Sequence, residues 1–354
     1  MTTMSAGRLD LETLVFGVTE VEVPEPGSGE VRIRVGAAGI CLSDVHLIDG
    51  TLDKDTIAAT GTYQSVVTLG HEVAGTVDRL GPDVPEDWKV GARVLLSAGK
   101  RCGVCRPCRF DTGPCLRPLT RGVNFDGGWA EYAITHHQAM VPIPDDLPFE
   151  QAAIIPDAVS TPYAGLIRTG GVRQGRSVGL WGVGGLGVHA VQIASAVGAA
   201  PIIAFDPLDA ARARALRMGA DGALDPADPD AATRVGELTD GSGLDVAVDL
   251  VGHPRVRSQA LSMLGARGVL SVIGLHPGPL AIDDSVLFGY LQQQVRGHYG
   301  YENQDLRDIV SLVRWRRLDL AASVSGVLDL ADAAEGVRRL AAKEGDPIRL
   351  LLRP

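Results

Sequence analysis

The sequence predicts an α/β protein of two domains, one a doubly wound parallel sheet and the other rich in β-strands. Its 354 residues exceed what a single compact core usually contains, and two domains of ordinary size account for this length. From about residue 177 onward, apolar strands alternate with helical stretches, which is typical of a parallel sheet with helices packed on it. The chain before this point shows short β-rich runs broken by Gly and Pro turns instead.

Each predicted element follows from a local pattern of apolar residues. In the first half, residues 31–35 and 73–77 are short β-rich runs. The tail contains a predicted helix over 305–314 and an apolar run, 348–352, that we expect to rejoin the first domain. In the second half, the predicted strands are 177–181, 201–205, 245–251 and 269–275, and the predicted helices are 188–197, 210–218 and 255–264.

Charge and hydropathy exclude several classes of partner. The chain carries 33 basic and 43 acidic residues, a net charge of −10, and no long basic cluster, so nucleic acid and anionic membrane are not expected partners. The N-terminus lacks a basic segment followed by a long apolar run, and no later stretch reaches the roughly 18 apolar residues of a spanning helix. We therefore expect a cytoplasmic location.

The cysteines indicate metal rather than disulfides, because their number is odd and four of the five lie in one loop. Four thiolates in a short loop suit tetrahedral zinc, and they leave no position open for a substrate, so this site is predicted to be structural. Reduced thiols without metal, or an iron–sulfur cluster, are the alternatives. The loop cysteines are Cys102, Cys105, Cys108 and Cys115.

A second metal site is predicted from the remaining cysteine, Cys41, and from His71 in the segment Gly-His-Glu at 70–72. A catalytic zinc needs about three protein ligands and an open position, and it accepts both thiolate and imidazole. Taken singly, a lone cysteine is more often a small buried apolar residue and a lone histidine a hydrogen-bonded one. The combination of the two residues favours the metal.

A nucleotide site is predicted where an apolar strand meets a helix. The four glycines of this turn follow the pattern G-x-G-x-x-G, which lets a pyrophosphate approach backbone N–H groups at the start of the helix. Asp206 ends the next strand, where its carboxylate can accept hydrogen bonds from the adenosine ribose and repel a 2′-phosphate, which favours NAD over NADP. A tight turn without ligand, and a plain turn residue before Pro207, are the alternatives. The glycines are Gly182, Gly184, Gly185 and Gly187.

The order of these motifs carries a family resemblance. The chain contains Cys-x-Ser-Asp-x-His at 41–46, then Gly-His-Glu, the four-cysteine loop and the glycine pattern. This order resembles the zinc-containing medium-chain alcohol dehydrogenases over essentially the whole chain. The resemblance implies a GroES-like catalytic domain over 1–158, a Rossmann NAD-binding domain over 159–299, and a segment, 300–354, that returns to the catalytic domain.

The resemblance also implies roles for further residues. The third ligand of the catalytic zinc would be Asp157, whose alternative role is to cap a helix N-terminus. Glu72 would be a catalytic group that lies behind the metal or ligates it transiently. Thr161 would pack near the nicotinamide, and Arg349 would contact the pyrophosphate.

The implied reaction moves a hydride between the carbinol carbon of an alcohol and NAD, with zinc lowering the pKa of the substrate hydroxyl. Ser43 would accept the hydroxyl proton and pass it toward His46, which titrates near neutral pH. An ordinary turn hydroxyl and a surface imidazole are the alternatives for these two residues.

The chain departs from the family at three places. Leu42 stands where many members carry a phosphate-binding arginine, and the spacing from Cys108 to Cys115 is one residue shorter than is common. The segment 49–69, which contains Gly61 and Tyr63, is longer than is usual in the family, and the alternatives are that it shapes the substrate pocket or that it forms a surface loop.

The segment at 156–157 resembles bacterial members that act on secondary alcohols and ketones, so a small secondary alcohol or ketone is the expected substrate. A polyol dehydrogenase of the same family is the near alternative. A zinc-free quinone or enoyl reductase, and a zinc-binding structural or regulatory protein without turnover, are the alternatives from other classes. The resemblance further implies a homodimer or homotetramer, in which residues 269–275 are the strand predicted to pair across the interface.

Overall fold

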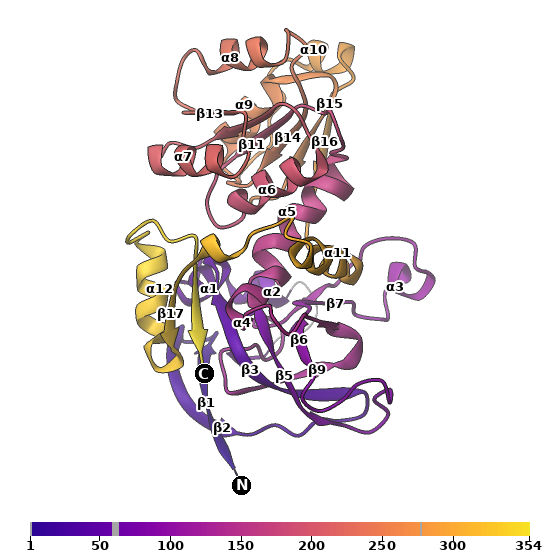
Figure 1. Ribbon diagram of the computed structural model, residues 1–354, viewed down its shortest axis with the longest axis vertical. Helices are drawn as coiled ribbons and strands as arrows, with labels where there is room; N and C mark the ends of the chain where they lie inside the picture. Colours follow the sequence, from indigo (N-terminus) through magenta and orange to yellow (C-terminus); the bar gives the residue numbers. More distant parts are fainter. Residues whose placement is uncertain (1, 59–63, 277) are drawn as a thin grey trace. The chain divides into compact units, whose positions relative to one another are not determined.

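The computed structural model describes residues 2–58, 64–276 and 278–354, and the chain divides into two compact units (Figure 1). The first unit contains Met1–Asp157, Leu306–Arg314 and Asp319–Pro354, and the second contains Ala158–Asp305 and Trp315–Leu318. The chain crosses between units at 157/158 and 305/306, where the sequence predicts 158/159 and 299/300, and again on either side of Trp315–Leu318. In the part of the chain that the structure describes, no helix combines the length and apolarity needed to cross a membrane.

The first unit is built on a seven-stranded sheet in the order β10-β6-β5-β3-β18-β17, with β9 also paired to β3. Two further sheets, β2-β1-β4 and β7-β8, belong to the same unit. The strands predicted at 31–35 and 73–77 are present as parts of β3 and β5, and both strands are longer than predicted. The strands are β1 Thr3–Asp10, β2 Val15–Glu22, β3 Glu30–Ile40, β4 Val66–Thr68, β5 Val73–Leu80, β6 Arg93–Leu96, β7 Gly99–Lys100, β8 Leu119–Thr120, β9 Tyr132–His136, β10 Met140–Pro142, β17 Val324–Asp329 and β18 Arg349–Arg353.

The C-terminal strand β18 is inserted into the sheet of the first unit. It pairs antiparallel with β3, where Leu350 faces Ile40, and parallel with β17. Its first four residues are buried because both neighbours and the helix α12, Ala333–Ala341, cover them. The apolar run predicted at 348–352 thus brings residues from the end of the chain next to the end of β3.

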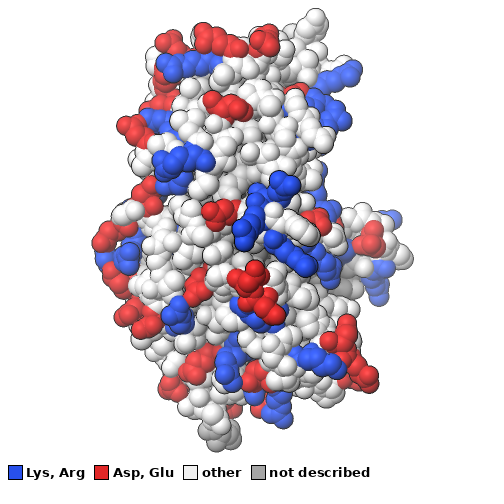
Figure 2. Space-filling view, in the orientation of Figure 1, with Lys and Arg blue, Asp and Glu red and all other residues white. Residues whose placement is uncertain are grey.

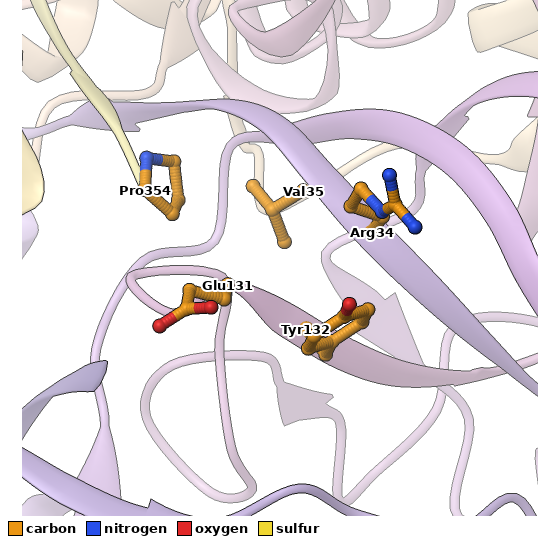
Figure 3. Close-up of a pocket in the computed structure, with 5 residues that line it drawn as sticks. All are labelled: Arg34, Val35, Glu131, Tyr132 and Pro354. Carbon is orange, nitrogen blue, oxygen red and sulfur yellow. The ribbon is translucent and has the colours of Figure 1, made fainter. Parts of the chain in front are cut away.

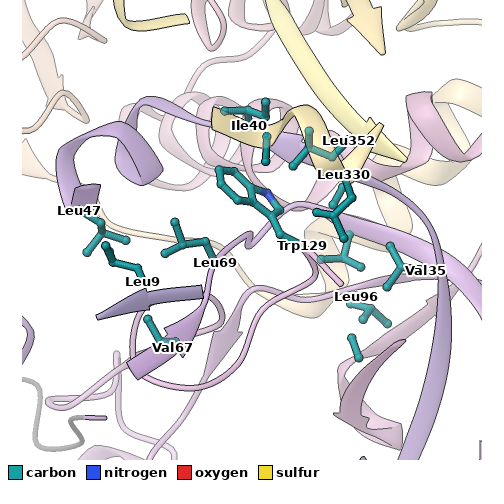
Figure 4. Close-up of a cluster of buried hydrophobic side chains, with 14 of the residues drawn as sticks. Leu9, Val35, Ile40, Leu47, Val67, Leu69, Leu96, Trp129, Leu330 and Leu352 are labelled. Atoms are coloured by element: carbon teal, nitrogen blue, oxygen red, sulfur yellow. The ribbon is translucent and has the colours of Figure 1, made fainter. Parts of the chain in front are cut away.

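The core of the first unit is a cluster of buried aliphatic side chains around Trp129 (Figure 4). Trp129 is fully buried, and Ile40, Leu69 and Leu330 surround its indole ring. This packing links β3, the segment before β5 and the C-terminal part of the unit, so the core holds together pieces that are distant in the sequence.

The segment 49–69 is anchored in this core at its described ends. It contains the helix α2, Lys54–Ala58, whose Ile57 is 2% exposed, and Leu52 packs against the same cluster. The strand β4 at its other end pairs with β1. Gly61 and Tyr63 lie outside the described residues.

The second unit contains a six-stranded parallel sheet in the order β13-β12-β11-β14-β15-β16, so the strand order reverses between β11 and β14. Every strand and helix predicted for 177–275 is present, with ends shifted by up to a few residues. The strands are β11 Val178–Trp181, β12 Ile202–Phe205, β13 Gly222–Leu224, β14 Leu244–Asp249, β15 Leu264–Val272 and β16 Gln294–Gly297. The helices are α5 Ser160–Ala164, α6 Gly187–Val197, α7 Asp209–Arg217, α8 Ala231–Leu238, α9 Pro254–Ser262 and α10 Ser285–Tyr290. The helix predicted at 305–314 is α11, Asn303–Arg314.

The predicted interface strand, 269–275, has no free edge. Residues Val269–Val272 of β15 pair with β14 on one side and with β16 on the other. The sequence does not reveal this because β16 is a short strand with mostly exposed residues. The edge strands of the described sheet are β13 and β16, so β16 and not 269–275 is the edge on this side, and the prediction for 269–275 is wrong.

Candidate active site

Three predicted zinc ligands from the first unit meet at one point. The Sγ of Cys41 lies 3.2 Å from Oδ2 of Asp157, and Nε2 of His71 lies 3.6 Å from the same oxygen. Ordinary zinc bond lengths in a tetrahedron place such ligand pairs about 3.4–3.6 Å apart. The three residues therefore fit a zinc ion with a position left for a further ligand, and they form one of two such groups in the described residues.

Asp44 ties two of these ligands together, although no role for it follows from the sequence motif alone. Cys41 stands at the end of β3 and precedes the helix α1, Leu42–Ile48. Its backbone N–H donates to Oδ2 of Asp44 at 2.9 Å, while Oδ1 of Asp44 lies 3.6 Å from Nδ1 of His71. Burial is the largest influence and opposes the charged form of His71, but the charge of Asp44 and hydrogen bonds with Asp157, Asp44 and Cys41 together raise the pKa of His71 well above its usual value. The carboxylate thus orients the imidazole so that Nε2 faces the metal position.

Asp157 lies in a π-helical turn, Ile155–Val159, a distortion found often at functional sites. Its carboxylate reaches both Cys41 and His71, as its predicted role as a zinc ligand requires. Burial alone would raise the pKa of Asp157, but the hydrogen bond and charge of His71 hold it well below its usual range. The side chain is therefore anionic at neutral pH, as a zinc ligand must be.

Glu72 and Arg349 form a buried pair behind the ligands. Oε1 of Glu72 lies 3.4 Å from Nη2 of Arg349, and a Cβ on Gly39 would come within 1.8 Å of Oε2 of Glu72. Burial raises the pKa of Glu72 to about 8 even though the Arg349 guanidinium opposes this shift. Glu72 adjoins the metal group through Arg349, whose Nη2 is 4.0 Å from Asp157.

The structure gives Arg349 partners in the first unit that the sequence does not predict. The guanidinium is buried, is paired with Glu72, and donates to the carbonyl of Ile40 at 3.4 Å, while its contact with the cofactor pyrophosphate stays a prediction. The cause is the insertion of β18 beside β3, which places residue 349 at the level of the metal ligands.

Ser43 and His46 lie three residues apart on α1, so both project from the same side of the helix. Both are half-buried, and Oγ of Ser43 lies 3.8 Å from Sγ of Cys41. Leu42, between the ligand and Ser43, is 45% exposed and offers no charge to a phosphate. The structure thus places the predicted proton acceptor beside the metal ligands, with His46 one turn further along.

The four loop cysteines form the second group of potential ligands. Sγ of Cys105 lies 3.3 Å from that of Cys108 and 3.9 Å from that of Cys115, and Cys102 and Cys108 are 3.9 Å apart. A tetrahedron of thiolates around one zinc has sulfurs about 3.8 Å apart. These distances fit a single ion, whereas a four-iron cluster would hold each cysteine sulfur on a different iron and therefore farther from the other three. The shortened spacing before Cys115 therefore does not prevent the cysteines from converging.

The glycine turn of the second unit has the backbone that a pyrophosphate site requires. Gly182 has φ +91°, and a Cβ on Gly187 would lie 1.8 Å from the carbonyl oxygen of Gly182, so neither position accepts a side chain without rearrangement. A Cβ on Gly184 would meet open space, and Gly185 accepts a hydrogen bond from the imidazole of His189. The turn is exposed at Gly184 and leads directly into α6, whose N-terminal end suits an anion.

Asp206 follows β12 and is nearly buried. Its Oδ2 accepts the N–H of Val183 at 2.8 Å, and its Oδ1 accepts the N–H of Leu208 at 2.9 Å. Each oxygen keeps a second lone pair, so the carboxylate can serve the turn and still accept ribose hydroxyls. Thr161 lies on α5 of the same unit and is half-buried.

A surface pocket in the first unit does not belong to this site. Its volume of about 360 Å³ is within the range of small-ligand sites. None of its lining residues is a predicted metal, cofactor or catalytic residue; they are Arg34, Val35, Glu131, Tyr132 and Pro354 (Figure 3).

Basic and acidic side chains are interspersed over the face in Figure 2, in keeping with the mixed charge of the sequence.

Comparison with known proteins agrees with the fold and the site. Residues 27–145 match the family model of the alcohol dehydrogenase GroES-like domain, and residues 185–315 match that of the zinc-binding dehydrogenases. The chain is 35% identical over 287 residues to an L-threonine 3-dehydrogenase of Pyrococcus abyssi, covering 80% of this chain and 79% of that protein. It is 34% identical over 325 residues to an NDMA-dependent alcohol dehydrogenase of Amycolatopsis methanolica, covering 84% of each.

Among solved structures, a Sinorhizobium meliloti 1021 protein bound to NADP superposes with a TM-score of 0.88 at 25% identity, over the full length of both chains. The predicted α/β fold, with a GroES-like domain and a Rossmann domain, is thereby confirmed. The relatives support an oxidoreductase that uses zinc and a nicotinamide cofactor. The chain therefore belongs to the zinc-type medium-chain dehydrogenase/reductase family.

Proposed function

We propose that the protein is an NAD-dependent dehydrogenase of secondary alcohols that holds one catalytic and one structural zinc. The convergence of Cys41, His71 and Asp157 with a position left for substrate carries this proposal. The four-cysteine group supports the structural ion because it leaves no such position. The choice of a secondary alcohol is supported by the Pyrococcus abyssi relative, since the 3-hydroxyl of L-threonine is on a secondary carbon.

Each predicted site residue has a separate role in the proposed reaction. When bound, zinc would supply a positive charge that polarises the substrate oxygen, and NAD would supply the hydride acceptor. Cys41 and Asp157 contribute negative charge, and His71, oriented by Asp44, completes the ligand set. The hydroxyl of Ser43 accepts the substrate proton and passes it toward His46.

Replacing Ser43 with alanine should lower kcat for alcohol oxidation by roughly a hundredfold, because a positioned proton acceptor contributes about 10²–10⁴ to the rate. Zinc content and the affinity for NADH should stay as in the wild type, since the side chain touches Cys41 only at 3.8 Å. Steady-state kinetics with elemental analysis checks this. Loss of zinc in the variant would instead assign Ser43 a structural role.

Replacing Asp206 with asparagine should raise KM for NAD about tenfold or more and reduce the preference for NAD over NADP. The amide oxygen can still accept the N–H of Val183, so the glycine turn is retained, while the N–H of Leu208 loses its acceptor and the charge that repels a 2′-phosphate is lost. Measuring kcat/KM with both cofactors checks this, and an unchanged ratio would remove Asp206 from cofactor selection.

We also propose that the protein assembles as a homodimer or homotetramer and takes a small alcohol or ketone as its substrate. The edge strand β16 supports self-association, because an edge presents unpaired backbone groups to a second copy. Val286 and Tyr290 of α10, the helix that precedes β16, are 80% and 83% exposed and add apolar surface to this part of the second unit. The oligomeric state in solution can be measured by light scattering.

The proposed function is tested by measuring zinc per chain and NADH formation on a panel of alcohols. The panel contains primary, secondary and polyhydroxy alcohols and L-threonine, each with NAD and with NADP. About two zinc ions with preferred oxidation of secondary alcohols by NAD is the expected result. A preference for polyols would contradict the substrate class, and no turnover with about one zinc would favour a protein without catalytic metal.

A further inference from the structure

A buried ion pair lies in the second unit, outside the residues that the proposed function uses. Nε of Arg257, on α9, lies 3.2 Å from Oδ2 of Asp249, the last residue of β14. The side chains are 8% and 0% exposed. Removing two charges from water is costly unless their remaining hydrogen-bonding groups are satisfied, so the partners of this pair indicate what it does.

The other N–H groups of the Arg257 guanidinium donate hydrogen bonds to a single loop. Nη1 donates to the carbonyl of Gly278 at 3.1 Å, and Nη2 donates to the carbonyls of Gly274 at 3.2 Å and His276 at 3.5 Å. All three acceptors belong to the segment that follows β15. Arg257 therefore stabilises the conformation of this loop through its backbone carbonyls.

Asp249 does the same for the loop that follows β14. Its Oδ1 accepts the backbone N–H groups of Val251 at 2.9 Å and Gly252 at 2.7 Å. A Cβ on Gly252 would lie 2.7 Å from the carbonyl carbon of Gly274, and one on Gly274 would lie 2.1 Å from the nitrogen of Gly252. The backbones of the two loops are thus in contact, and the ion pair between Asp249 and Arg257 links the two loops.

The position of these two loops at the sheet indicates that they contribute to the cofactor site. In a parallel sheet, ligands bind beyond the carboxyl ends of the strands where the strand order reverses. That reversal lies between β11, which leads into the glycine turn, and β14, which leads into the loop held by Asp249. The loops after β14 and β15 therefore form the side of the crevice opposite the turn after β12 that contains Asp206.

We propose that Arg257 is a positioning residue for the nicotinamide cofactor. Through Asp249 and the carbonyls of Gly274, His276 and Gly278, it holds the loops after β14 and β15 in the conformation that receives the cofactor, without touching it. This proposal rests on the proposed function only in that the cofactor is a nicotinamide dinucleotide bound by the second unit.

The test uses the double variant Asp249→Asn/Arg257→Leu, because Arg257→Leu alone would leave a buried carboxylate without its partner. Asparagine can still accept the N–H groups of Val251 and Gly252, so only the link to the second loop is removed. We expect the Kd for NADH, measured by calorimetric titration, to rise about tenfold or more. KM for the alcohol at saturating NAD and the zinc content should change less than about twofold. Arg257→Lys should give a Kd for NADH between that of the wild type and that of the double variant, since lysine keeps the charge and loses the planar guanidinium.

The matched control lies at the opposite end of the same sheet. Arg176 and Asp245 form an ion pair where β11 and β14 begin. The double variant Asp245→Asn/Arg176→Leu should lower the thermal midpoint without changing the Kd for NADH. Equal weakening by both double variants, or wild-type affinity in Asp249→Asn/Arg257→Leu, would overturn the positioning role. Failure of the wild-type protein to bind NADH or NADPH would instead overturn the proposed function, and this inference with it.

Discussion

Replacing Asp157 with alanine should leave one zinc per chain and lower kcat/KM for alcohol oxidation roughly a thousandfold. The variant removes the carboxylate oxygen that lies within 3.2 Å of Cys41 and 3.6 Å of His71, so only two ligands remain. Loss of the metal's stabilisation of developing charge, several kcal/mol and here taken as about 4 kcal/mol, corresponds to this factor. The zinc that remains is the one assigned to the four-cysteine loop.

Two further variants make the assignment specific. Asp157→Cys should restore the second zinc, because thiolate is an accepted ligand at this position. Glu150→Ala removes a carboxylate on the helix α4, Phe149–Ala153, which pairs with Arg353 at the surface, and it should retain both zinc ions and full activity. Elemental analysis and kinetics on the three proteins decide the matter. If Asp157→Ala kept two zinc ions and most of its activity, Glu72 rather than Asp157 would be the third ligand.

Features set by neighbouring residues could be predicted from the sequence. The parallel sheet follows from strands and helices that alternate within about thirty residues, and the four-cysteine group follows from a loop short enough to bring its thiols together. Cys41 and His71 were combined on their ligand chemistry, and the family resemblance then supported the pair, since thirty residues separate them and no local pattern brings them together.

Features that depend on contacts between distant segments could not be predicted. The buried position of Arg349 depends on the insertion of β18 beside β3, which no local pattern specifies. The link from Asp44 to His71 joins two motifs that were each recognised, but a motif does not show which way a carboxylate points. The edge strand β16 was missed because its residues lack the apolar pattern of a buried strand.

Replacing Trp129 with alanine should lower the free energy of unfolding of the first unit by about 3–5 kcal/mol, the usual cost of truncating a buried aromatic side chain. At about 2–4 °C per kcal/mol for a unit of this size, the thermal midpoint should fall by roughly 10 °C. Trp129 is fully buried in the core shown in Figure 4. It packs edge to face with Phe16, with 5.7 Å between the centroids of the two rings. Differential scanning calorimetry measures the change.

The same side chain should also affect the catalytic metal, because it supports both segments that carry ligands. Its Nε1–H donates to the carbonyl of Gly39 at 3.0 Å, two residues before Cys41. A Cβ on Gly70, the residue before His71, would lie 2.2 Å from Cδ1 of the indole, so the ring and the glycine backbone define each other's position. Trp129→Phe keeps most of the packing and loses the N–H donor, so it should cost about 1–3 kcal/mol.

Comparison with a second buried tryptophan separates the two effects. Trp181, in the second unit, donates from Nε1 to Gln259 at 3.0 Å and stacks on Phe205, so Trp181→Phe removes a similar hydrogen bond far from the ligands in sequence. We expect Trp129→Phe to weaken zinc binding at the catalytic site about 10–100-fold in competition with a chelator, and Trp181→Phe to leave it unchanged. If both variants lost stability alike while neither changed zinc affinity, the indole would be only a core residue. If zinc affinity falls in Trp129→Phe alone, the position of the ligands is set by the core that packs beneath them as well as by the residues that bind the metal.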